Sequence, residues 1–571
     1  MIAVLTAALA APPFIDWGAQ RGVIERAISR AAGVEAKTDG RIEVRLLPSP
    51  RIRIERLRLG PAESDAPSLL AAFARTEIAL MPLLRGEVRF QETRIGRAEI
   101  RVPTDGSGGW RLPKEMLSSG LQREWAFEDL AIAQLLITTT APATGRTDQF
   151  YAQAVRVEAQ SLAGPWRIEG AAGTVPFRLA TGELSGNQTV QVKLSGGGDR
   201  VPRFDIDAKV AFPSGQGDAL SPDATGTAKV FLGPPAQAAA AGLPIPVAVQ
   251  SSFKTVGREI ALEGLSVEAG EGGASLRLGG AGVIRLDEPR LSLRLEGKRI
   301  DIDSFILSAA GREMLSRAGA WAPPPLSFPI DLDLAVSSIG LGQEELSNLA
   351  LKATLLRGRA VLDKAELIAP GQTRIALEGV VGLSTEGGAN GRFAIASSAS
   401  DRFARYLDKL GLSGPFVALL DGRPLEAAAD IMIADPVTSL HNVRIGLGEA
   451  RLTGNVRYTA PEESTRGRLE AQVAMQGLDL AELPPVASLF GTARNLDVGL
   501  ILDARGLRYG SQTGAGRIVA RVLSDGPELV VEALDISDLA GANARVSGRI
   551  APDGSGRIAG KVTAKRAAPL V

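Results

Sequence analysis

Three pairs of aspartates come nearest, by residue type and spacing, to a catalytic or cation-binding site in this chain. The pairs are Asp205/Asp207, Asp301/Asp303 and Asp331/Asp333. Two neighbouring carboxylates can act as acid and base or can bind a cation. Each pair is spaced i, i+2 within an alternating segment, however, and on a strand both side chains would then point to the same solvent face. We therefore predict no catalytic site and no metal site at these pairs.

The chain also lacks most residues on which common active sites depend. It has no cysteine, which excludes disulfides, thiolate nucleophiles and cysteine-ligated zinc. His441 is the only histidine, so histidine-based triads and multi-histidine metal sites are excluded, and we expect His441 to be an ordinary surface or edge residue. No GxxxxGK[ST] loop is present. The sequence therefore predicts neither an enzyme nor a bound cofactor.

The composition favours many short strands over a compact enzyme domain. The chain has 571 residues, of which 45% are hydrophobic but only 4% are aromatic, and it contains 65 glycines and 34 prolines. Small aliphatic residues with frequent Gly and Pro suit strands joined by tight turns. The net charge is zero, so no overall field attracts the protein to nucleic acid, and we predict no nucleic-acid partner.

Residues 12–60 contain a helix followed by an amphipathic β-ribbon. Asp16 can cap a helix that Gly33 would end, and from Arg41 onward the period of the pattern changes to two. One face of this ribbon is apolar and the other carries arginines. The candidate groove residues here are Ile42, Val44, Leu46, Ile52 and Ile54, and the candidate headgroup or membrane-proximal residues are Arg41, Arg45, Arg51 and Arg53. These arginines also suit a plain solubilising face.

The first fifteen residues, MIAVLTAALAAPPFI, are apolar and uncharged. A bilayer span needs about 20 such residues, and Pro12-Pro13 interrupts this run. No basic segment or cleavage site of a signal peptide is evident. We interpret residues 1–15 as the outer end of a membrane anchor, with a buried N-terminal helix or strand as the alternative.

A pattern of strand, glycine and second strand recurs in the later part of the chain. The recurring glycines are Gly280, Gly379, Gly454 and Gly548, and three of these units should continue into helices at 303–318, 401–410 and 479–490. Units with one apolar face are expected to stack and to bury that face jointly. The candidate groove residues in these units are Leu291, Leu293, Leu295, Val546 and Ile550.

The order of motifs near the N-terminus resembles a known family. The segments follow in this order: an apolar end, PPFIDW, a helix with IERAISRAAG, RIEVRLLPSPRIRIERLRLG, LMPLLRGEV and DGSGGW. This order is similar to that in the N-terminal region of the AsmA family of Gram-negative envelope proteins. The AsmA family in turn resembles the bridge-like lipid-transfer proteins that begin with a chorein-type domain. The resemblance implies a periplasmic β-structure attached to the inner membrane and a role in outer-membrane biogenesis.

The fold expected from these patterns is mainly β with a few short helices. We predict an elongated, curved antiparallel sheet that forms a groove from repeated units. The expected regions are an anchor segment at 1–15, a chorein-like region at 16–112, a middle β region at 113–242 and repeated β units at 243–571. Faces of Leu, Ile, Val and Ala can line an open trough, and closed sandwiches with dry cores are the alternative.

Lipid transport along this groove is the function that the resemblance favours. The partners would be phospholipids, the inner membrane and a protein of the periplasm or outer membrane, and transfer would be passive because the sequence offers no nucleotide site. One alternative is a scaffold or assembly factor that helps outer-membrane proteins fold by strand addition. An adhesin-like β-repeat and an enzyme of polysaccharide metabolism fit the sequence less well.

Overall fold

The computed structural model consists almost entirely of strands joined by short turns. It describes residues 16–32, 34–45, 49–61, 67–79, 81, 88–104, 110–111, 125–141, 145–161, 164–186, 188–198, 201–212, 219–220, 222–231, 246–270, 275–308, 312, 328–382, 388–412, 417, 420–461, 466–477, 496–508, 516–525, 528–539, 541–551 and 555–564. Strands hold 75% and helices 7% of the structure. These fractions confirm the predicted mainly β fold with a few short helices.

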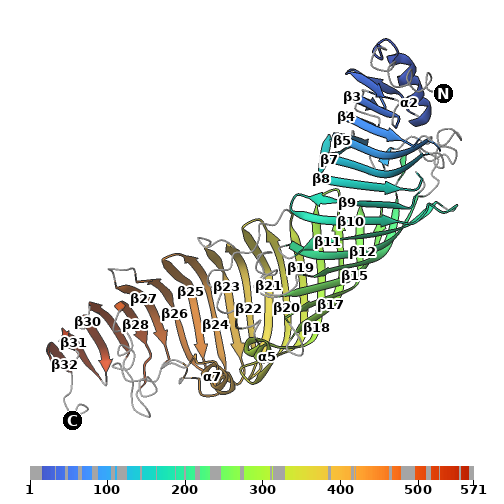
Figure 1. The fold of residues 1–571 in the computed structure, drawn as a ribbon. Coiled ribbons are helices and arrows are strands. Elements are labelled where there is room, and N and C mark those ends of the chain that lie inside the picture. Colours follow the sequence, from blue (N-terminus) through green and yellow to red (C-terminus); the bar gives the residue numbers. More distant parts are fainter. Residues whose placement is uncertain are drawn as a thin grey trace, which may run out of the picture. The chain divides into compact units, whose positions relative to one another are not determined.

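The chain divides into two compact units, which are described separately. Unit 1 comprises Met1–Ala269 and Gly280–Pro289, and unit 2 comprises Gly270–Gly279 and Arg290–Val571. In each unit the strands lie side by side in an open sheet (Figure 1). Thirty strands take part in these sheets, and β6 and β13 form a separate two-stranded ribbon. The region boundaries predicted at residues 112 and 242 remain predictions.

Unit 1 begins with a helix and continues with strands of two to seventeen residues. The elements are α2 (Arg21–Ala32), β1 (Ala36–Thr38), β2 (Ile42–Arg45), β3 (Arg51–Leu59), β4 (Ser68–Ile78), β5 (Val88–Pro103), β6 (Trp110–Arg111), β7 (Trp125–Ala141), β8 (Arg146–Ala159), β9 (Trp166–Ala172), β10 (Val175–Thr181), β11 (Thr189–Gly198), β12 (Val201–Ala211), β13 (Ala219–Leu220), β14 (Asp223–Phe231), β15 (Val247–Val256) and β16 (Glu259–Ala269). Strand β17 (Leu276–Arg285) contributes residues to both units.

Unit 2 contains the remaining strands and two helices that lie at the strand ends in Figure 1. Its elements are β18 (Arg290–Asp301), α5 (Ile302–Leu307), β19 (Ile330–Leu341), β20 (Glu344–Leu356), β21 (Arg359–Ala369), β22 (Thr373–Gly382), β23 (Ala389–Ser397), α7 (Ser400–Lys409), β24 (Leu425–Ala434), β25 (Val437–Leu447), β26 (Ala450–Thr459), β27 (Gly467–Gln476), β28 (Leu496–Arg505), β29 (Arg517–Asp525), β30 (Glu528–Leu539), β31 (Ala542–Ile550) and β32 (Gly556–Ala564).

The sheets are mainly antiparallel, as predicted, but three of the strand pairs that the structure describes are parallel. These pairs are β5 with β7 in unit 1, and β18 with β19 and β27 with β28 in unit 2. A parallel pair needs a crossover of a dozen or more residues, whereas a two-residue turn can join an antiparallel pair. Each parallel pair is accordingly joined by one of the long connections of the chain, and α5 starts the connection between β18 and β19.

Side chains of α2 bond the backbone of the first strand of the sheet in unit 1. The guanidinium of Arg21 donates to the carbonyls of Thr38 and Gly40, both at 2.9 Å. Glu25 Oε1 accepts from the Thr38 N–H at 2.7 Å, and Ser29 Oγ accepts from the Ala36 N–H at 2.8 Å. These residues follow one another at i, i+4 and i+8, so one helix face satisfies an edge strand that would otherwise be free to pair.

Asp16 bonds the turn before α2 and not the helix itself. Its side chain accepts from the Gly18 N–H at 3.0 Å, and the helix begins at Arg21. Among the residues that the structure describes, no helix is both long enough and apolar enough to cross a membrane. The predicted anchor at 1–15 and the groove candidate Leu46 lie outside the described residues.

Three of the four recurring glycines lie where a neighbouring strand leaves no room for a side chain. A Cβ at Gly379, Gly454 or Gly548 would come within 2.1–2.4 Å of a backbone carbonyl oxygen of the next strand. Glycine inside a strand is typical of a tight bend or a close backbone approach. The repeat seen in the sequence therefore marks points where the strands of unit 2 approach one another closely.

Two helices of unit 2 match the change of period seen in the sequence. α7 covers residues 400–409, within one residue of the predicted 401–410. α5 begins at Ile302, one residue before the predicted start at 303, but it ends at Leu307, well before the predicted end at 318. The Asp301 side chain caps α5 by accepting from the Ser304 N–H at 2.9 Å. That bond, with a second from the Ser304 hydroxyl, lowers the pKa of Asp301. The predicted helix at 479–490 lies outside the described residues.

The three aspartate pairs have structural partners. Asp205 and Asp207 are exposed on one face of β12, and Lys193 Nζ lies 4.0 and 3.9 Å from their carboxylates. The prediction was wrong for Asp303, because capping by Asp301 starts the helix before it. The Asp303 carboxylate instead accepts from the N–H groups of Gly342 and Gln343, both at 2.8 Å.

Asp331 is the most extensively bonded of these aspartates, and its contacts predict a pH effect on stability. Arg290 Nη1 donates to both carboxylate oxygens at 2.9 Å, and the Thr354 and Ser292 hydroxyls donate at 3.1 and 3.3 Å. Burial raises the pKa of Asp331, but these donors outweigh it and the pKa lies below its ordinary value. The stabilisation is therefore present above the ordinary pKa of about 4 and is lost as the pH falls further.

We expect Asp331→Asn to lower the urea midpoint of unit 2 at pH 7 and to have a smaller effect at pH 3. Urea unfolding of both proteins at several pH values measures this difference. A difference that stays constant down to pH 3 would show that the charge of Asp331 contributes nothing.

Candidate functional site

A continuous apolar row crosses all fifteen strands of unit 2 from β18 to β32. Its members are direct partners in the strand register: Leu293, Leu332, Ala353, Leu362, Gly379, Gly391, Ile431, Leu440, Val456, Ala471, Leu500, Val522, Val531, Gly548 and Ile558. Every member is Leu, Ile, Val, Ala or Gly. We call this set the central apolar row. It crosses every strand of the unit without a polar residue.

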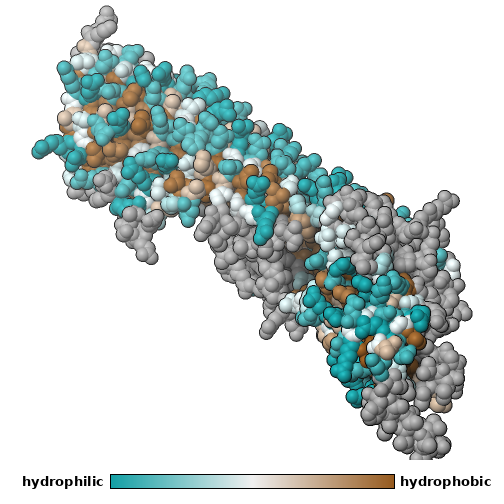
Figure 2. Space-filling view, turned by 90° about the horizontal axis from the view of Figure 1, so that it is seen from above, coloured by the Kyte–Doolittle hydropathy of each residue, from teal (hydrophilic) through white to brown (hydrophobic). Residues whose placement is uncertain are grey.

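Further apolar rows lie beside the central apolar row on the same face. One runs through Leu295, Leu334, Leu351, Ala365, Leu377 and Phe393, and another through Val443, Gly454, Val473, Leu502, Ala520, Leu534 and Val546. The candidates Leu291, Leu293, Leu295, Val546 and Ile550 all belong to this face. Figure 2 shows hydrophobic residues in a band over these strands with hydrophilic residues beside it.

The side chains of this face shield one another but remain accessible to solvent. Leu295 is buried, with 6% of its surface exposed, whereas Leu291, Leu293, Val546 and Ile550 are half-buried. Leu377 keeps 41% of its surface exposed and Ile558 keeps 61%. Core residues of a closed sandwich would be buried on both sides. The exposure pattern of the described residues fits an open trough rather than a dry sandwich core.

One border of the face in unit 2 is closed by the two helices. Phe305 of α5 and Phe403 and Tyr406 of α7 are buried, and the α7 residues pack with Val336, Ile339 and other aliphatic residues of the sheet. Burial raises the pKa of Tyr406. This dry cluster fixes the helices on the sheet and leaves the central apolar row uncovered by either helix.

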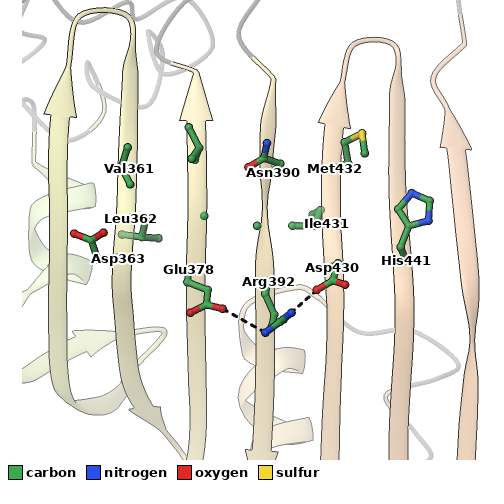
Figure 3. Close-up of a pocket in the computed structure, with 13 residues that line it drawn as sticks. Val361, Leu362, Asp363, Glu378, Asn390, Arg392, Asp430, Ile431, Met432 and His441 are labelled. Carbon is green, nitrogen blue, oxygen red and sulfur yellow. Dashed lines mark hydrogen bonds and ion pairs between the residues drawn. The ribbon is translucent and has the colours of Figure 1, made fainter.

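The opposite face of unit 2 is charged and holds a shallow pocket of about 570 Å³ (Figure 3). Arg392 lies between two carboxylates, with its Nε 3.0 Å from Asp430 Oδ1 and its Nη1 3.6 Å from Glu378 Oε1. Asn442 donates to Asp430 at 2.7 Å, and this bond together with Arg392 lowers the pKa of Asp430. His441 is exposed on β25, as predicted. The charged residues of the pocket thus form solvated ion pairs, and the rest of its lining includes apolar residues such as Val361 and Met432.

Unit 1 carries an apolar face of the same kind. One row runs through Val157, Ile168, Leu179, Leu194, Ile206 and Ala228 on β8 to β14, and another through Ile42, Ile54, Ala74, Ile95 and Ile132 on β2 to β7. The candidates Val44 and Ile52 are direct partners on β2 and β3. Ile42 and Ile54 are buried, and Val44 and Ile52 are half-buried. The apolar candidates of the ribbon that the structure describes therefore share one face.

The arginine candidates lie on the other face of the ribbon. Arg41 and Arg53 each lie near a glutamate of the same segment, at 3.3 Å from Glu43 and 3.5 Å from Glu55. Arg51 contacts Glu77 of β4 at 2.5 Å, and Arg45 is exposed. Residues 16–59 contain ten Lys or Arg residues and six Asp or Glu residues. This end of the sheet is thus basic although the whole chain is neutral.

Sequence reasoning missed most residues of the central apolar row. Period-two alternation was visible in β24 and β28, yet it does not reveal which residue of each strand aligns with Leu293. Asn348 in β20 and Asn442 in β25 have positive φ angles, and the pairing of each strand with its neighbour is irregular there. These irregularities shift the strand register from the one that regular residue-by-residue pairing would give. Among the described residues, no cluster of three metal-ligating side chains occurs.

The N-terminal part of the chain matches a known family. The AsmA family model matches residues 1–135, a range that includes α2 and β1 to β5 and ends within β7. No curated protein and no solved structure matches the chain. This similarity supports a role in envelope and outer-membrane biogenesis. The match confirms the resemblance predicted from the N-terminal motifs, and residues 1–135 are thus similar to the AsmA family of envelope proteins.

Proposed function

We propose that this protein guides phospholipids along the apolar faces of its sheets. In this proposal the N-terminus attaches to the inner membrane and the bulk of the chain lies in the periplasm. Acyl chains slide along aliphatic side chains while headgroups stay in water at the mouth of the trough. The protein acts as a passive path and not as an enzyme, so direction and energy come from elsewhere.

The observation that carries this proposal is the central apolar row. Burying an acyl chain is worth about 0.8 kcal/mol per CH₂, so a 16-carbon chain needs on the order of 12 kcal/mol of continuous apolar contact. Strands lie about 4.8 Å apart, so the row extends on the order of 70 Å through unit 2. An isolated pocket would hold one lipid, whereas a row without a polar interruption keeps an acyl chain in apolar contact from strand to strand.

The basic end of unit 1 suits the membrane-proximal role in this proposal. Each Lys or Arg near an anionic bilayer contributes about 1 kcal/mol to binding. Arg45 is exposed, and Arg41 keeps 76% of its side-chain surface exposed despite its contact with Glu43. Both can therefore reach headgroups.

Photo-crosslinking inside cells tests the path. A photoreactive residue at Ile52, Leu293 or Val546 should form lipid adducts, detected by mass spectrometry after purification in mild detergent. Arg294 and Ser547 are exposed on the opposite face and serve as matched controls. We expect lipid adducts at the three apolar positions and few at the two controls.

The same experiment separates lipid transfer from the rival function. A scaffold for outer-membrane proteins would give protein adducts and no lipid adducts at Ile52, Leu293 and Val546. That outcome would exclude the lipid path and favour the scaffold. Equal lipid labelling at the three apolar positions and the two controls would reflect non-specific detergent or lipid contact and would also contradict the proposal.

A further inference from the structure

A second type of site lies in unit 1, where charged residues of the polar face and the rings of Phe177, Phe204 and Phe231 line the same hollow. It is a hollow of about 920 Å³ built by β8, β9, β10, β11, β12 and β14. Its charged lining residues are Arg156, Arg178, Arg203, Lys229, Glu169 and Asp205. Four cations and two carboxylates give the lining a net charge of +2. The hollow is therefore basic, within a chain whose net charge is zero.

The floor of the hollow consists of small residues of β11, namely Ser195, Gly196 and Gly197. No larger side chain fits at the two glycines of this floor. A Cβ at Gly196 would lie 2.4 Å from the Phe204 ring, and one at Gly197 would lie 2.1 Å from the Pro202 carbonyl oxygen. Gly197 also has a φ of +96°, which disfavours any other residue. The two glycines consequently add no side chain to the hollow, whose lining also includes four cationic residues.

Three of the four cations around this floor have no acidic partner among the described residues, whereas Arg178 pairs with Glu169. Glu169 lies 3.2 Å from Arg178, and Asp205 lies 4.0 Å from Lys193, which is outside the hollow. Within the part of the chain that the structure describes, Arg156, Arg203 and Lys229 form no ion pair. Asp205 and Lys229 are direct strand partners, yet no ion pair joins them. Positive charge thus remains available to an incoming anion.

An aromatic ring holds one of these cations in place. The guanidinium carbon of Arg203 lies 5.1 Å from the centroid of the Phe231 ring, within the range of a cation–π interaction. Arg203 and Phe231 are direct partners on β12 and β14, and Lys229 lies two residues before Phe231 on the same face. The ring limits the motion of Arg203 and leaves its N–H donors free for a ligand.

We propose that this hollow binds a phosphate group, with Arg203 and Lys229 as its principal ligands and the Ser195 hydroxyl as an additional donor. Guanidinium and ammonium groups are the usual protein partners of phosphate, Arg through its fork of donors and Lys as a point charge. The volume accommodates a phosphate together with a substituent such as glycerol. The phosphate can belong to a membrane phospholipid or to a small soluble ester. The site is separate from the apolar rows and does not depend on lipid transfer along them.

The test compares binding of two phosphate sources to the intact chain. Inorganic phosphate and glycerol phosphate, titrated by calorimetry, probe the soluble source. Sedimentation with phosphatidylglycerol vesicles, and with phosphatidylcholine vesicles for comparison, probes the lipid source. The double variant Arg203→Ala/Lys229→Ala removes two exposed cations from the hollow.

A matched control removes two exposed cations outside the hollow. Lys209 and Lys254 lie on the same face, on β12 and β15, and both pair in register with Thr225. We expect the double variant in the hollow to weaken binding at least tenfold and Lys209→Ala/Lys254→Ala to weaken it less than twofold. Phe231→Leu keeps every charge but removes the ring, so a loss of about threefold is expected. Unchanged circular dichroism spectra would show that the variants are folded.

The possible outcomes separate the two sources and decide the proposal. Saturable binding of glycerol phosphate that the hollow variant loses supports a soluble ester. Binding only to phosphatidylglycerol vesicles, again lost in the hollow variant alone, supports a lipid headgroup. Absence of binding to every probe, or equal loss in both double variants, would overturn the site. None of these outcomes depends on lipid adducts at Leu293 or Val546, so the two proposals can fail independently.

Discussion

Leu293→Asp is expected to block lipid passage through unit 2 while the protein stays folded and abundant. Leu293 belongs to the central apolar row and pairs with Leu332 of β19. The side chain is only half-buried, so water can hydrate an introduced carboxylate when the trough is empty. An acyl chain that passes must displace this water, and an uncompensated buried charge costs several kcal/mol. We therefore expect the substitution to hinder the passage of lipid more than it destabilises the fold.

The measurement compares abundance, lipid adducts and outer-membrane integrity in cells that carry the variant. We expect wild-type abundance, at least a tenfold loss of lipid adducts from a crosslinker at Val546, and an outer-membrane defect like that of a deletion strain. Lys298→Asp is the matched control, because it places the same carboxylate on the same strand at an exposed position. Full complementation by Leu293→Asp would show that Leu293 does not line the path.

Local patterns predicted the elements of this fold better than they predicted its pairings. Residues 400–409 form α7 because the apolar period changes from two to 3.6 there, and this change is visible in the sequence. The parallel pair of β27 and β28 could not be predicted, because it joins strands across residues 477–495 and depends on which edge of the sheet the chain returns to. The period of the apolar residues predicts which residues of a strand share a face, but it does not predict which strands pair.

Asp303 illustrates how one capping bond can overturn a pattern. The spacing of Asp301 and Asp303 suits a strand, and β18 does extend through Asp301. The Asp301 carboxylate then caps α5, so Asp303 falls in the first turn of the helix and reaches the backbone of Gly342. The carboxylate thereby joins two segments about forty residues apart. Alternation alone contains no information about this contact.

The phosphate-binding hollow was missed because no single segment contains it. Arg203 and Lys229 belong to different strands, and the floor at Ser195 to Gly197 belongs to a third. Each segment, read alone, is an ordinary amphipathic strand. The one local signal was the Gly196-Gly197-Gly198 run at the end of β11, because consecutive glycines inside a strand indicate a bulge or a close approach. The apolar candidates were simpler to find, since a half-buried face repeats every second residue.

Gly454→Val is expected to destabilise unit 2 locally and to interrupt its apolar face. Gly454 pairs with Val443 and Val473, and a Cβ there would lie 2.1 Å from the Gln472 carbonyl oxygen and 3.0 Å from the Val473 Cα. Both contacts are with backbone, so β26 and β27 must move apart. Such overpacking costs about 1–3 kcal/mol. Hydrogen exchange is the suitable measurement, because a chain with two units need not unfold in one step and exchange reports local opening.

We expect backbone amides of β26 and β27 to exchange at least about fivefold faster in Gly454→Val, which corresponds to about 1 kcal/mol, while amides of β19 and β20 stay unchanged. Gly499→Ala on β28 is the matched control, since its Cβ would meet the Leu523 Cδ2 and the Glu470 Cγ at ordinary distances of 3.6 and 3.9 Å. Replacing an unstrained strand glycine by alanine should slow exchange slightly, because alanine loses less backbone entropy on folding. Equal exchange in the two variants would mean that close strand approach does not explain the recurring glycine. A selective effect at β26 and β27 would instead tie the sequence repeat to the close strand approach that keeps the apolar face of unit 2 continuous.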